Sequence, residues 1–274
     1  MFYPDGLPRR QELAYAAQSF GSLEVNASFY RLQSAATYDR WFSQTPADFV
    51  FALKGSRYIT HMKKLRGAEA GLANFFASGL LRLRDKLGPF VWQLPPNLTF
   101  VPEVLEDFLA QLPTTHRAAT ELALLAERPG VPFEGGPNDR PLRHALEIRH
   151  PSFLSDDCLN LLRRHRVALV VADAAGLYPL IEEGTTDFMY VRLHGSQALY
   201  SSGYTRPELQ DWERRIRAWS AGNAPADMRT VNGPPRLSGP QDVYVYFDND
   251  IGAHAPADAA TLRGLLGLGN PDAP

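Results

Sequence analysis

Basic side chains at the ends of predicted β-strands are the residues of this sequence best suited to chemistry. Lys54 closes the predicted strand Phe49–Gly55, while Arg149 and Arg192 alternate with aliphatic residues in two later strands. A guanidinium group can hold a phosphate or a carboxylate through two parallel N–H···O bonds, and a lysine adds a point charge. The three cations therefore predict a site for a phosphorylated or otherwise anionic small molecule.

Acid–base groups accompany these cations. Glu24 and Glu147 are candidates for general acid and base, since two carboxylates beside arginines can titrate at different pH values. His194 ends a strand and could transfer a proton or bind a ligand, although a lone histidine is more often simply hydrogen-bonded. Asp173 is a further carboxylate at a strand end. Such groups suit a hydrolase, a lyase or an isomerase.

The four acid–base candidates are also residue types that bind divalent metals in β/α barrels. The interleaved lysine and arginines would repel a cation, so a divalent metal is possible but not favoured. The sequence has no P-loop, Gly-rich dinucleotide fingerprint, nucleophile elbow or His-Glu-x-x-His helix. It therefore predicts no metal-ligand set, and the cofactor stays unknown.

The loop between Ser56 and Arg66 offers a different chemistry. Its basic or titratable side chains are Arg57, His61, Lys63, Lys64 and Arg66. Tyr58 adds a ring available for stacking. A solvated basic loop is the simpler interpretation of Lys63, Lys64 and Arg66. The formal net charge of −2 gives no global attraction to nucleic acid or to an anionic membrane, so nucleic-acid binding would need a local patch of this kind.

Predicted strands and helices alternate along the chain and would position these residues. The strands are predicted at Ser22–Asn26, Phe49–Gly55, Pro89–Leu94, the stretch from His144 that His150-Pro151 ends, Ala168–Asp173, Phe188–His194 and Asp242–Asp248. The helices are predicted from Pro8 to Gly21, at Ala36–Gln44, along Leu72–Leu87, around Leu105–Leu112, near Ala118–Ala126, from Ser155 to His165, after the capping box at Thr205, and at Ala257–Leu268. A Gly/Pro loop is predicted at Pro129–Pro141. This alternation predicts parallel β/α units in one sheet.

Strand parity predicts where the polar side chains point. In a barrel of parallel strands one parity faces the helices and the other faces the axis. The axis-facing set at the strand ends is Glu24, Asn26, Lys54, Gln93, Glu147, Arg149, Asp173, Arg192, His194, Tyr244 and Tyr246. These side chains would converge at the C-terminal mouth, where active sites of such barrels lie. A structural ion-pair network is the alternative, but burying six charges for stability alone is costly.

The chain length suits one large domain. A closed β/α barrel has eight strands, whereas seven are predicted here and the chain opens on a helix, so the first strand is expected upstream of Met1. We expect a single β/α barrel domain over residues 1–274. Cys158 is the only cysteine, and neither a leader nor a membrane-spanning apolar run is recognised, so a cytoplasmic protein with no membrane partner is predicted.

Six ordered motifs resemble the YecE-like family, known as domain of unknown function 72. They are Leu23-Glu-Val-Asn-Ala-Ser-Phe-Tyr-Arg31, Phe51-Ala-Leu-Lys-Gly-Ser-Arg-Tyr-Ile-Thr-His61, Trp92-Gln-Leu-Pro-Pro96, Glu147-Ile-Arg-His-Pro-Ser-Phe153, Tyr190-Val-Arg-Leu-His-Gly195 and Tyr244-Val-Tyr-Phe-Asp-Asn249. The resemblance covers nearly the whole chain and implies a TIM-type barrel. The family's usual first strand, of the Gly-Thr-Ser-Gly-Trp type, has no counterpart here, which implies a member that is N-terminally truncated or has a misassigned start.

The resemblance implies a set of site residues but no established reaction. That set is Asn26, Tyr30, Lys54, Arg57, His61, Gln93, Glu147, Arg149, His150, Asp173, Arg192, His194 and Asn249. The barrel is similar in outline to xylose isomerase-like and endonuclease IV-like barrels, which is an analogy of fold alone.

Three hypotheses follow. The leading one is an enzyme for an anionic small substrate, in which Lys54, Arg57, Arg149 and Arg192 bind the anion and Glu24, Glu147 or His194 moves protons. On this hypothesis an Arg192→Ala variant should lose anion binding without unfolding. The second is a nucleic-acid-processing or nucleic-acid-binding barrel that uses the basic loop and Tyr58. The third is a non-catalytic ligand-binding or scaffold protein, favoured if ion pairs within the chain fill the mouth.

Overall fold

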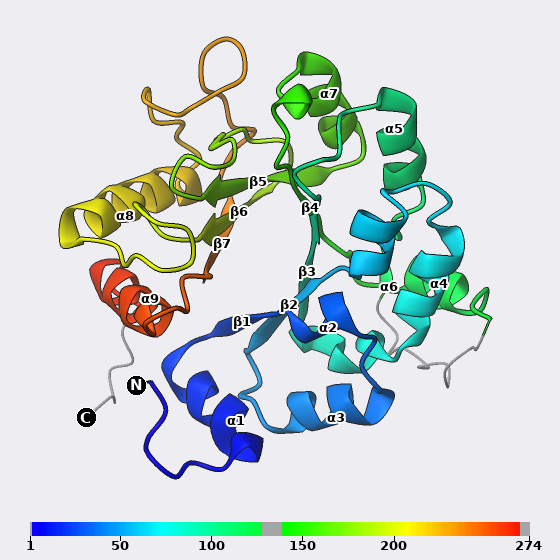
Figure 1. Cartoon of the computed structure of the whole chain (residues 1–274), viewed down its shortest axis with the longest axis horizontal. Helices are drawn as coiled ribbons and strands as arrows, with labels where there is room; N and C mark the ends of the chain where they lie inside the picture. The colour runs from blue at the N-terminus through cyan, green and yellow to red at the C-terminus, as the bar shows by residue number, and fades with distance from the viewer. Residues whose placement is uncertain (1, 128–138, 269–274) are drawn as a thin grey trace. The chain divides into compact units, whose positions relative to one another are not determined.

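Seven parallel strands with flanking helices form an α/β fold of the TIM-like class in the computed structural model, which describes residues 2–127 and 139–268 (Figure 1). The strands are β1 (Ser22–Val25), β2 (Val50–Lys54), β3 (Leu87–Gln93), β4 (His144–Glu147), β5 (Val167–Asp173), β6 (Phe188–Leu193) and β7 (Asp242–Phe247). They follow one another in the sheet in chain order. The predicted fold class and the seven predicted strands are confirmed. Most of the predicted loop at 129–141 lies outside the described residues.

The α-helices are α1 (Arg9–Ser19), α2 (Ala27–Tyr30), α3 (Ala35–Ser43), α4 (Glu69–Ala77), α5 (Pro102–Ala110), α6 (His116–Ala123), α7 (Asp156–Arg164), α8 (Arg206–Ser220) and α9 (His254–Leu265). A π-helix, η1 (Tyr58–Met62), and two 3₁₀-helices, η2 (Leu80–Lys86) and η3 (Pro151–Phe153), complete them. Among residues 2–127 and 139–268, no helix combines the length and the hydropathy that spanning a bilayer requires.

Two predicted elements differ from the structure. The single long helix predicted along Leu72–Leu87 is wrong, because the chain breaks at Gly79 into α4 and η2. Gly79 has a φ of +105°, and a Cβ there would lie 2.7 Å from the Cα of Ala35, so this close approach needs glycine. The segment predicted as a loop between β2 and α4 contains the π-helix η1.

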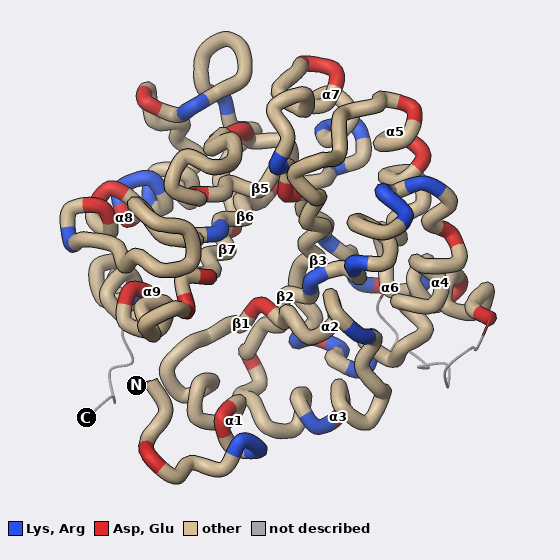
Figure 2. The backbone as a smooth tube through the Cα atoms, viewed as in Figure 1, with Lys and Arg blue, Asp and Glu red and all other residues tan. Residues whose placement is uncertain are grey.

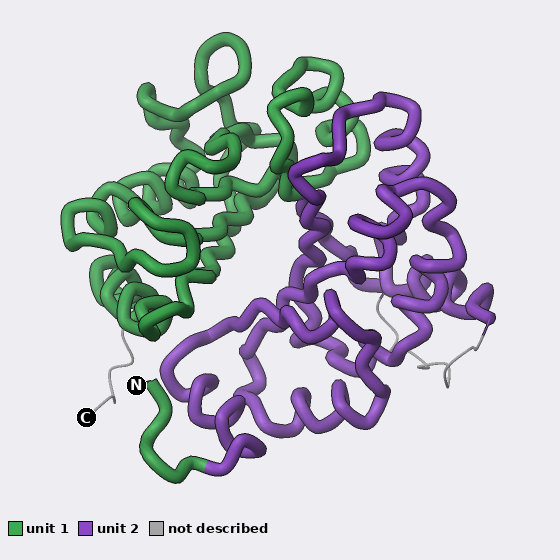
Figure 3. Tube along the Cα trace, viewed as in Figure 1, with its two compact units in different colours: residues 1–7, 147–274 green, residues 8–146 purple. Residues whose placement is uncertain are grey.

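The chain divides into two compact units, drawn in different colours in Figure 3. One consists of residues 1–7 and 147–274, and the other of residues 8–146. The first is called the C-terminal unit below and the second the N-terminal unit. The prediction of a single domain over 1–274 stays a prediction.

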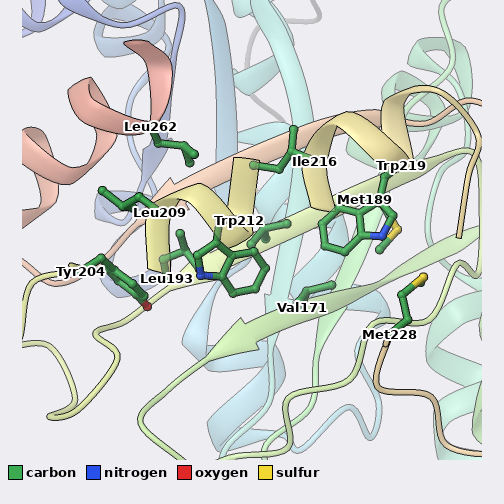
Figure 4. Packing of buried hydrophobic residues seen from close by; sticks show 11 residues of the cluster. Val171, Met189, Leu193, Tyr204, Leu209, Trp212, Ile216, Trp219, Met228 and Leu262 are labelled. Atoms are coloured by element: carbon green, nitrogen blue, oxygen red, sulfur yellow. The ribbon is translucent and has the colours of Figure 1, made fainter. Parts of the chain in front are cut away.

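In the C-terminal unit, α8 and α9 pack on one face of the parallel strands β5, β6 and β7. The predicted capping box starts α8, with Thr205 accepting from the backbone N–H of Glu208 and Glu208 accepting from that of Thr205. Trp212 and Trp219 of this helix lie against Met189 and other aliphatic residues of β6 (Figure 4). The predicted helix-facing parity of β6 and β7 is therefore confirmed.

Strand β5 departs from the predicted parity. Its Val171 pairs with Val191 and belongs to the core beneath α8, while Ala172 pairs with Arg192. Paired residues of parallel strands point to the same face, so Asp173 shares its face with Leu193 rather than with Arg192. The prediction that Asp173 faces the axis is wrong. Both parities of β5 are apolar up to Asp173, so the strand itself gave no alternation to follow.

In the N-terminal unit, β1, β2 and β3 are parallel and neighbouring, and aromatic residues of α4 and β3 fill the core. The rings of Phe75 and Trp92 lie 5.6 Å apart, and His144 of β4 stacks on Phe90 at 5.2 Å. The indole Nε1 of Trp92 donates to His144 Nδ1 at 3.2 Å, and His144 Nε2 lies 2.8 Å from the carbonyl of Pro113. This network places the single ring proton of His144 on Nε2.

His144 should make the fold sensitive to acid. Burial lowers the pKa of His144 to about 4, although the hydrogen bond to the carbonyl of Pro113 acts to raise it. In the unfolded chain the imidazole of His144 takes up a proton as the pH falls below about 6.5, whereas in the folded chain it stays neutral until about pH 4. The free energy of unfolding therefore decreases as the pH is lowered through this interval. We expect a loss of about 2 kcal/mol between pH 7.5 and pH 5, measured by urea unfolding. The free energy of unfolding of a His144→Gln variant should fall by about 2 kcal/mol less over the same pH range. Equal losses in both proteins would show that His144 is not the cause.

Candidate functional site

Glu147, at the end of β4, joins two arginines. Its Oε1 accepts from Arg149 Nε at 2.7 Å, and its Oε2 accepts from Arg192 Nη1 at 2.5 Å. The side chains of Glu147 and Arg192 are completely buried, and that of Arg149 is 7% exposed. A buried carboxylate needs such compensation, because water no longer solvates its charge. The structure thus brings three of the predicted residues together at the strand ends.

The second terminal nitrogen of Arg192 extends the cluster toward β7. Its Nη2 donates to Oδ2 of Asp248 at 2.9 Å, and this carboxylate is 22% exposed. His194 Nδ1 lies 3.2 Å from the same oxygen, while His194 Nε2 lies 3.5 Å from Arg192 Nη1. Since a guanidinium can only donate, His194 Nε2 is an acceptor, which places the ring proton on the Asp248 side. His194 Nδ1 and Asp248 are therefore within ion-pair distance, although Nδ1 makes no hydrogen bond within the described residues.

Two tyrosines cover the outer side of Arg149. Its Nη1 donates to the hydroxyl of Tyr178 at 3.4 Å, and its Nη2 donates to that of Tyr200 at 3.3 Å. The guanidinium also lies over the Tyr178 ring, 4.4 Å from the centroid. Burial acts to lower the pKa of Arg149, but the Glu147 carboxylate and Tyr200 outweigh it and raise this pKa above its ordinary value. Arg149 thus stays charged. Its Nε is held by Glu147, and its two terminal nitrogens make only long hydrogen bonds to the tyrosine hydroxyls.

The loops that carry these tyrosines hold left-handed residues. Tyr200 has a φ of +61° and Ala175, in the loop after β5, one of +51°. Non-glycine residues in this region cost roughly 1–3 kcal/mol and concentrate at functional sites. The ring of Tyr200 also lies edge-on to His194, with centroids 5.4 Å apart. Tyr200 therefore covers both the anion-binding and the proton-transfer candidates.

Asp173 and Asn249 take part in hydrogen bonds that hold the loop after β6. The Tyr204 hydroxyl donates to Asp173 at 3.2 Å and accepts from the N–H of Gly195 at 3.1 Å. Asn249 Nδ2 donates to Asp258 at 2.8 Å and to the carbonyl of Ser202 at 3.0 Å. Burial raises the pKa of Asp173 and that of Tyr204. Both predicted residues therefore contact the loop rather than Arg192.

Two further predicted residues complete the C-terminal unit. His150 caps η3, since its Nδ1 accepts from the N–H of Ser152 at 3.1 Å. Tyr246 pairs with Arg192 across β6 and β7, and its ring centroid lies 5.2 Å from that of Tyr190. It therefore shares the face of the buried cluster, as its parity predicts.

The remaining predicted residues lie in the N-terminal unit. Lys54 is nearly buried at the end of β2, with its Nζ 4.5 Å from the Phe29 ring centroid. His61 lies edge-on to the same ring, with 5.1 Å between the centroids. The others are Glu24 in β1, Asn26 at the start of α2, Tyr30 in α2, Arg57 before η1, and the buried Gln93 at the end of β3.

Sequence reasoning missed Asp248, Tyr178 and Tyr200. Asp248 continues the parity of Tyr244 and Tyr246 and could have been found by extending that count by one position. The two tyrosines lie in irregular loops, where no periodicity predicts a direction. Among residues 2–127 and 139–268, no group of three or more His, Cys, Asp or Glu side chains is arranged to hold a metal ion.

Solved structures with the same fold support the fold class. The chain is similar to TM1631, a DUF72 family protein from Thermotoga maritima, with 23% identity, a TM-score of 0.70, and coverage of 97% of this chain and 92% of that one. A second is EF0366, a DUF72 family protein from Enterococcus faecalis, with 17% identity, a TM-score of 0.69, and coverage of 96% and 92%. At these identities the likeness concerns the fold alone.

A match over its whole length shows the family to which the chain belongs. Residues 1–274 match the family described as protein of unknown function DUF72. The chain belongs to this family, as its six motifs predicted. No curated protein matches it.

Proposed function

We propose that the buried cluster of the C-terminal unit is the active site of an enzyme that binds a phosphorylated or carboxylated small substrate through Arg149. The observation that supports this proposal is the state of that side chain. Its Nε is fixed on Glu147, while its two outer nitrogens donate only long hydrogen bonds to tyrosine hydroxyls. An anionic oxygen makes shorter and stronger bonds to a guanidinium than a neutral hydroxyl does, so a substrate anion can replace these contacts.

The other residues then take separate roles. Glu147 positions the arginines, because each of its oxygens accepts from one of them. Arg192 orients Asp248 and His194, since its terminal nitrogens donate to groups of this cluster. His194 moves the proton, and Asp248, whose Oδ2 lies 3.2 Å from Nδ1, stabilises the protonated form of the ring by its charge.

Tyr200 must move for this chemistry to occur. Its hydroxyl occupies an outer nitrogen of Arg149 and its ring covers His194, which is completely buried. Displacement of Tyr200 by the substrate anion would expose both groups at once. This coupling would restrict proton transfer to the occupied site.

The test is ligand stabilisation of the whole protein. We expect one or more compounds from a panel of phosphorylated and carboxylated metabolites, with inorganic phosphate included, to raise the melting temperature by several degrees at saturating concentration. Arg149→Lys keeps the charge but loses the planar fork, so it should weaken binding of the hit at least about tenfold. Arg206→Lys, the same change at an exposed position of α8, should leave binding unchanged.

Turnover of the hit separates an enzyme from a binding protein. His194→Gln should keep binding and abolish product formation, measured by mass spectrometry. The complete burial of His194 and Glu147 favours a non-catalytic ligand-binding protein as the second candidate, which binding without turnover in the unmodified chain would support. If the panel gives no stabilisation, or if Arg149→Lys binds the hit normally, the proposed role of Arg149 is wrong.

A further inference from the structure

The segment between β2 and α4 of the N-terminal unit concentrates positive charge. From Lys54 to Arg66 it contains five lysines and arginines and no aspartate or glutamate. Arg57, Lys63 and Arg66 are exposed. Blue bands mark this part of the backbone in Figure 2. The near-neutral net charge of the chain thus hides a local basic surface.

The exposed cations of this segment are not neutralised by carboxylates within the described residues. Within the described residues, Arg57, Lys63 and Arg66 form no ion pair, whereas Arg82 of the same unit donates to Asp39 at 2.9 Å. Unpaired surface cations are the groups that can neutralise phosphates and release the counterions around a nucleic acid. The basic surface is therefore free to bind a polyanion.

Exposed aromatic rings lie on the same elements. Tyr58, in η1, is 43% exposed, and Lys63 Nζ lies 5.8 Å from its centroid. Tyr30, in α2, is 70% exposed. The two elements are in contact through Phe29 and His61. Large exposed rings beside cations suit the stacking of unpaired bases.

The backbone of the segment is held in an unusual shape. Residues 58–62 form a π-helix, a rare conformation found frequently at functional sites. Lys64 and Leu65 follow with φ values of +49° and +69°. Leu65 is 3% exposed, and its N–H donates to the carbonyl of Ile59 at 3.0 Å, which anchors the turn. The basic side chains thus project from an ordered turn rather than from an extended loop.

We infer that this surface, formed by Tyr30, Arg57, Tyr58, Lys63 and Arg66, binds single-stranded nucleic acid. A duplex hides its base faces in the stack and would leave the exposed tyrosines unused. A membrane would need a broad apolar face, but η1 has five residues, of which Met62 is the exposed aliphatic one. The inference concerns different residues from Arg149 and its neighbours, so each proposal can fail without the other.

The experiment measures fluorescence anisotropy of a labelled 20-nucleotide deoxythymidine strand with the full chain over a range of salt concentrations. We expect binding that weakens with salt. The double variant Lys63→Ala/Arg66→Ala should reduce the slope of log affinity against log salt by about 1.4, since each lost phosphate contact accounts for about 0.7. The matched control Arg9→Ala/Arg10→Ala removes two exposed arginines of α1 in the same unit and should leave the slope unchanged.

Tyr58 tests the stacking contribution. Tyr58→Ala should weaken binding about tenfold, whereas Tyr58→Phe, which keeps the ring, should stay within about twofold. No binding of the strand would overturn the inference, as would equal effects of the two double variants. Equal binding of a 20-base-pair duplex with no effect of Tyr58→Ala would also overturn it. So would binding to phosphatidylserine vesicles without binding to the strand.

Discussion

Replacing Glu147 with alanine should lower the free energy of unfolding by about 3–5 kcal/mol, because it removes the shared acceptor of two buried guanidinium groups. Arg192 is completely buried and would keep Asp248 but lose the carboxylate on its Nη1, and Arg149 would lose the acceptor of its Nε. Removing one side of a buried ion pair leaves an uncompensated charge, which costs far more than an ordinary truncation. Urea unfolding at pH 7, followed by circular dichroism, measures the effect.

A double variant shows whether the uncompensated charge causes the loss. Adding Arg192→Met to Glu147→Leu should recover at least half of the stability that Glu147→Leu alone loses, since buried ion pairs can be replaced by apolar side chains at little cost. Asp248 then loses an arginine but is partly exposed, so water can solvate it. A loss below about 1 kcal/mol for Glu147→Ala would mean that both arginines find other acceptors.

This arrangement also decides which arginine can test anion binding. The sequence suggested Arg192→Ala as a variant that would lose binding and stay folded. In the structure Arg192 lies between Glu147, Asp248 and His194, so its removal would leave Glu147 with a lost partner. We therefore expect Arg192→Ala to lose stability, and Arg149→Lys is the better variant because its outer nitrogens face replaceable hydroxyls.

Truncation of Trp219 should have an effect of similar size in the core of the C-terminal unit. This side chain is completely buried on α8, beside Trp212 and the strand residue Met189 (Figure 4). Trp219→Ala should lower the free energy of unfolding by about 3–5 kcal/mol, because the surrounding residues cannot fill the cavity it leaves. Thermal and urea unfolding should both report the loss.

Phenylalanine at this position distinguishes packing from hydrogen bonding. The indole Nε1 of Trp219 is buried and has no hydrogen-bond partner among the described residues. Trp219→Phe removes this costly donor and keeps a ring, so we expect a loss under about 1.5 kcal/mol. Leu177→Ala, at a residue that is 62% exposed in the same unit, should stay within about 0.5 kcal/mol. A Trp219→Phe variant as unstable as Trp219→Ala would contradict this explanation.

Alternation of side chains predicted much of the candidate site. Strands β4, β6 and β7 each have a clear polar and a clear apolar parity, and their polar members Glu147 and Arg192 do meet. Strand β5 is apolar on both faces until its last residue, so its parity is ambiguous, and the predicted face of Asp173 is wrong. Periodicity is informative only where one face of a strand differs from the other.

The sequence by itself determined the order of strands and helices, the family and the residue types at the strand ends, because these follow from local periodicity and from motifs. Only the tertiary structure decided which charges compensate one another and which residues cover them. Tyr178 and Tyr200 reach Arg149 from irregular loops, and the left-handed turn at Tyr200 is held by hydrogen bonds to distant residues such as Ile251. Contacts of this kind depend on where the whole chain brings a loop, and a local sequence pattern carries no information about that position.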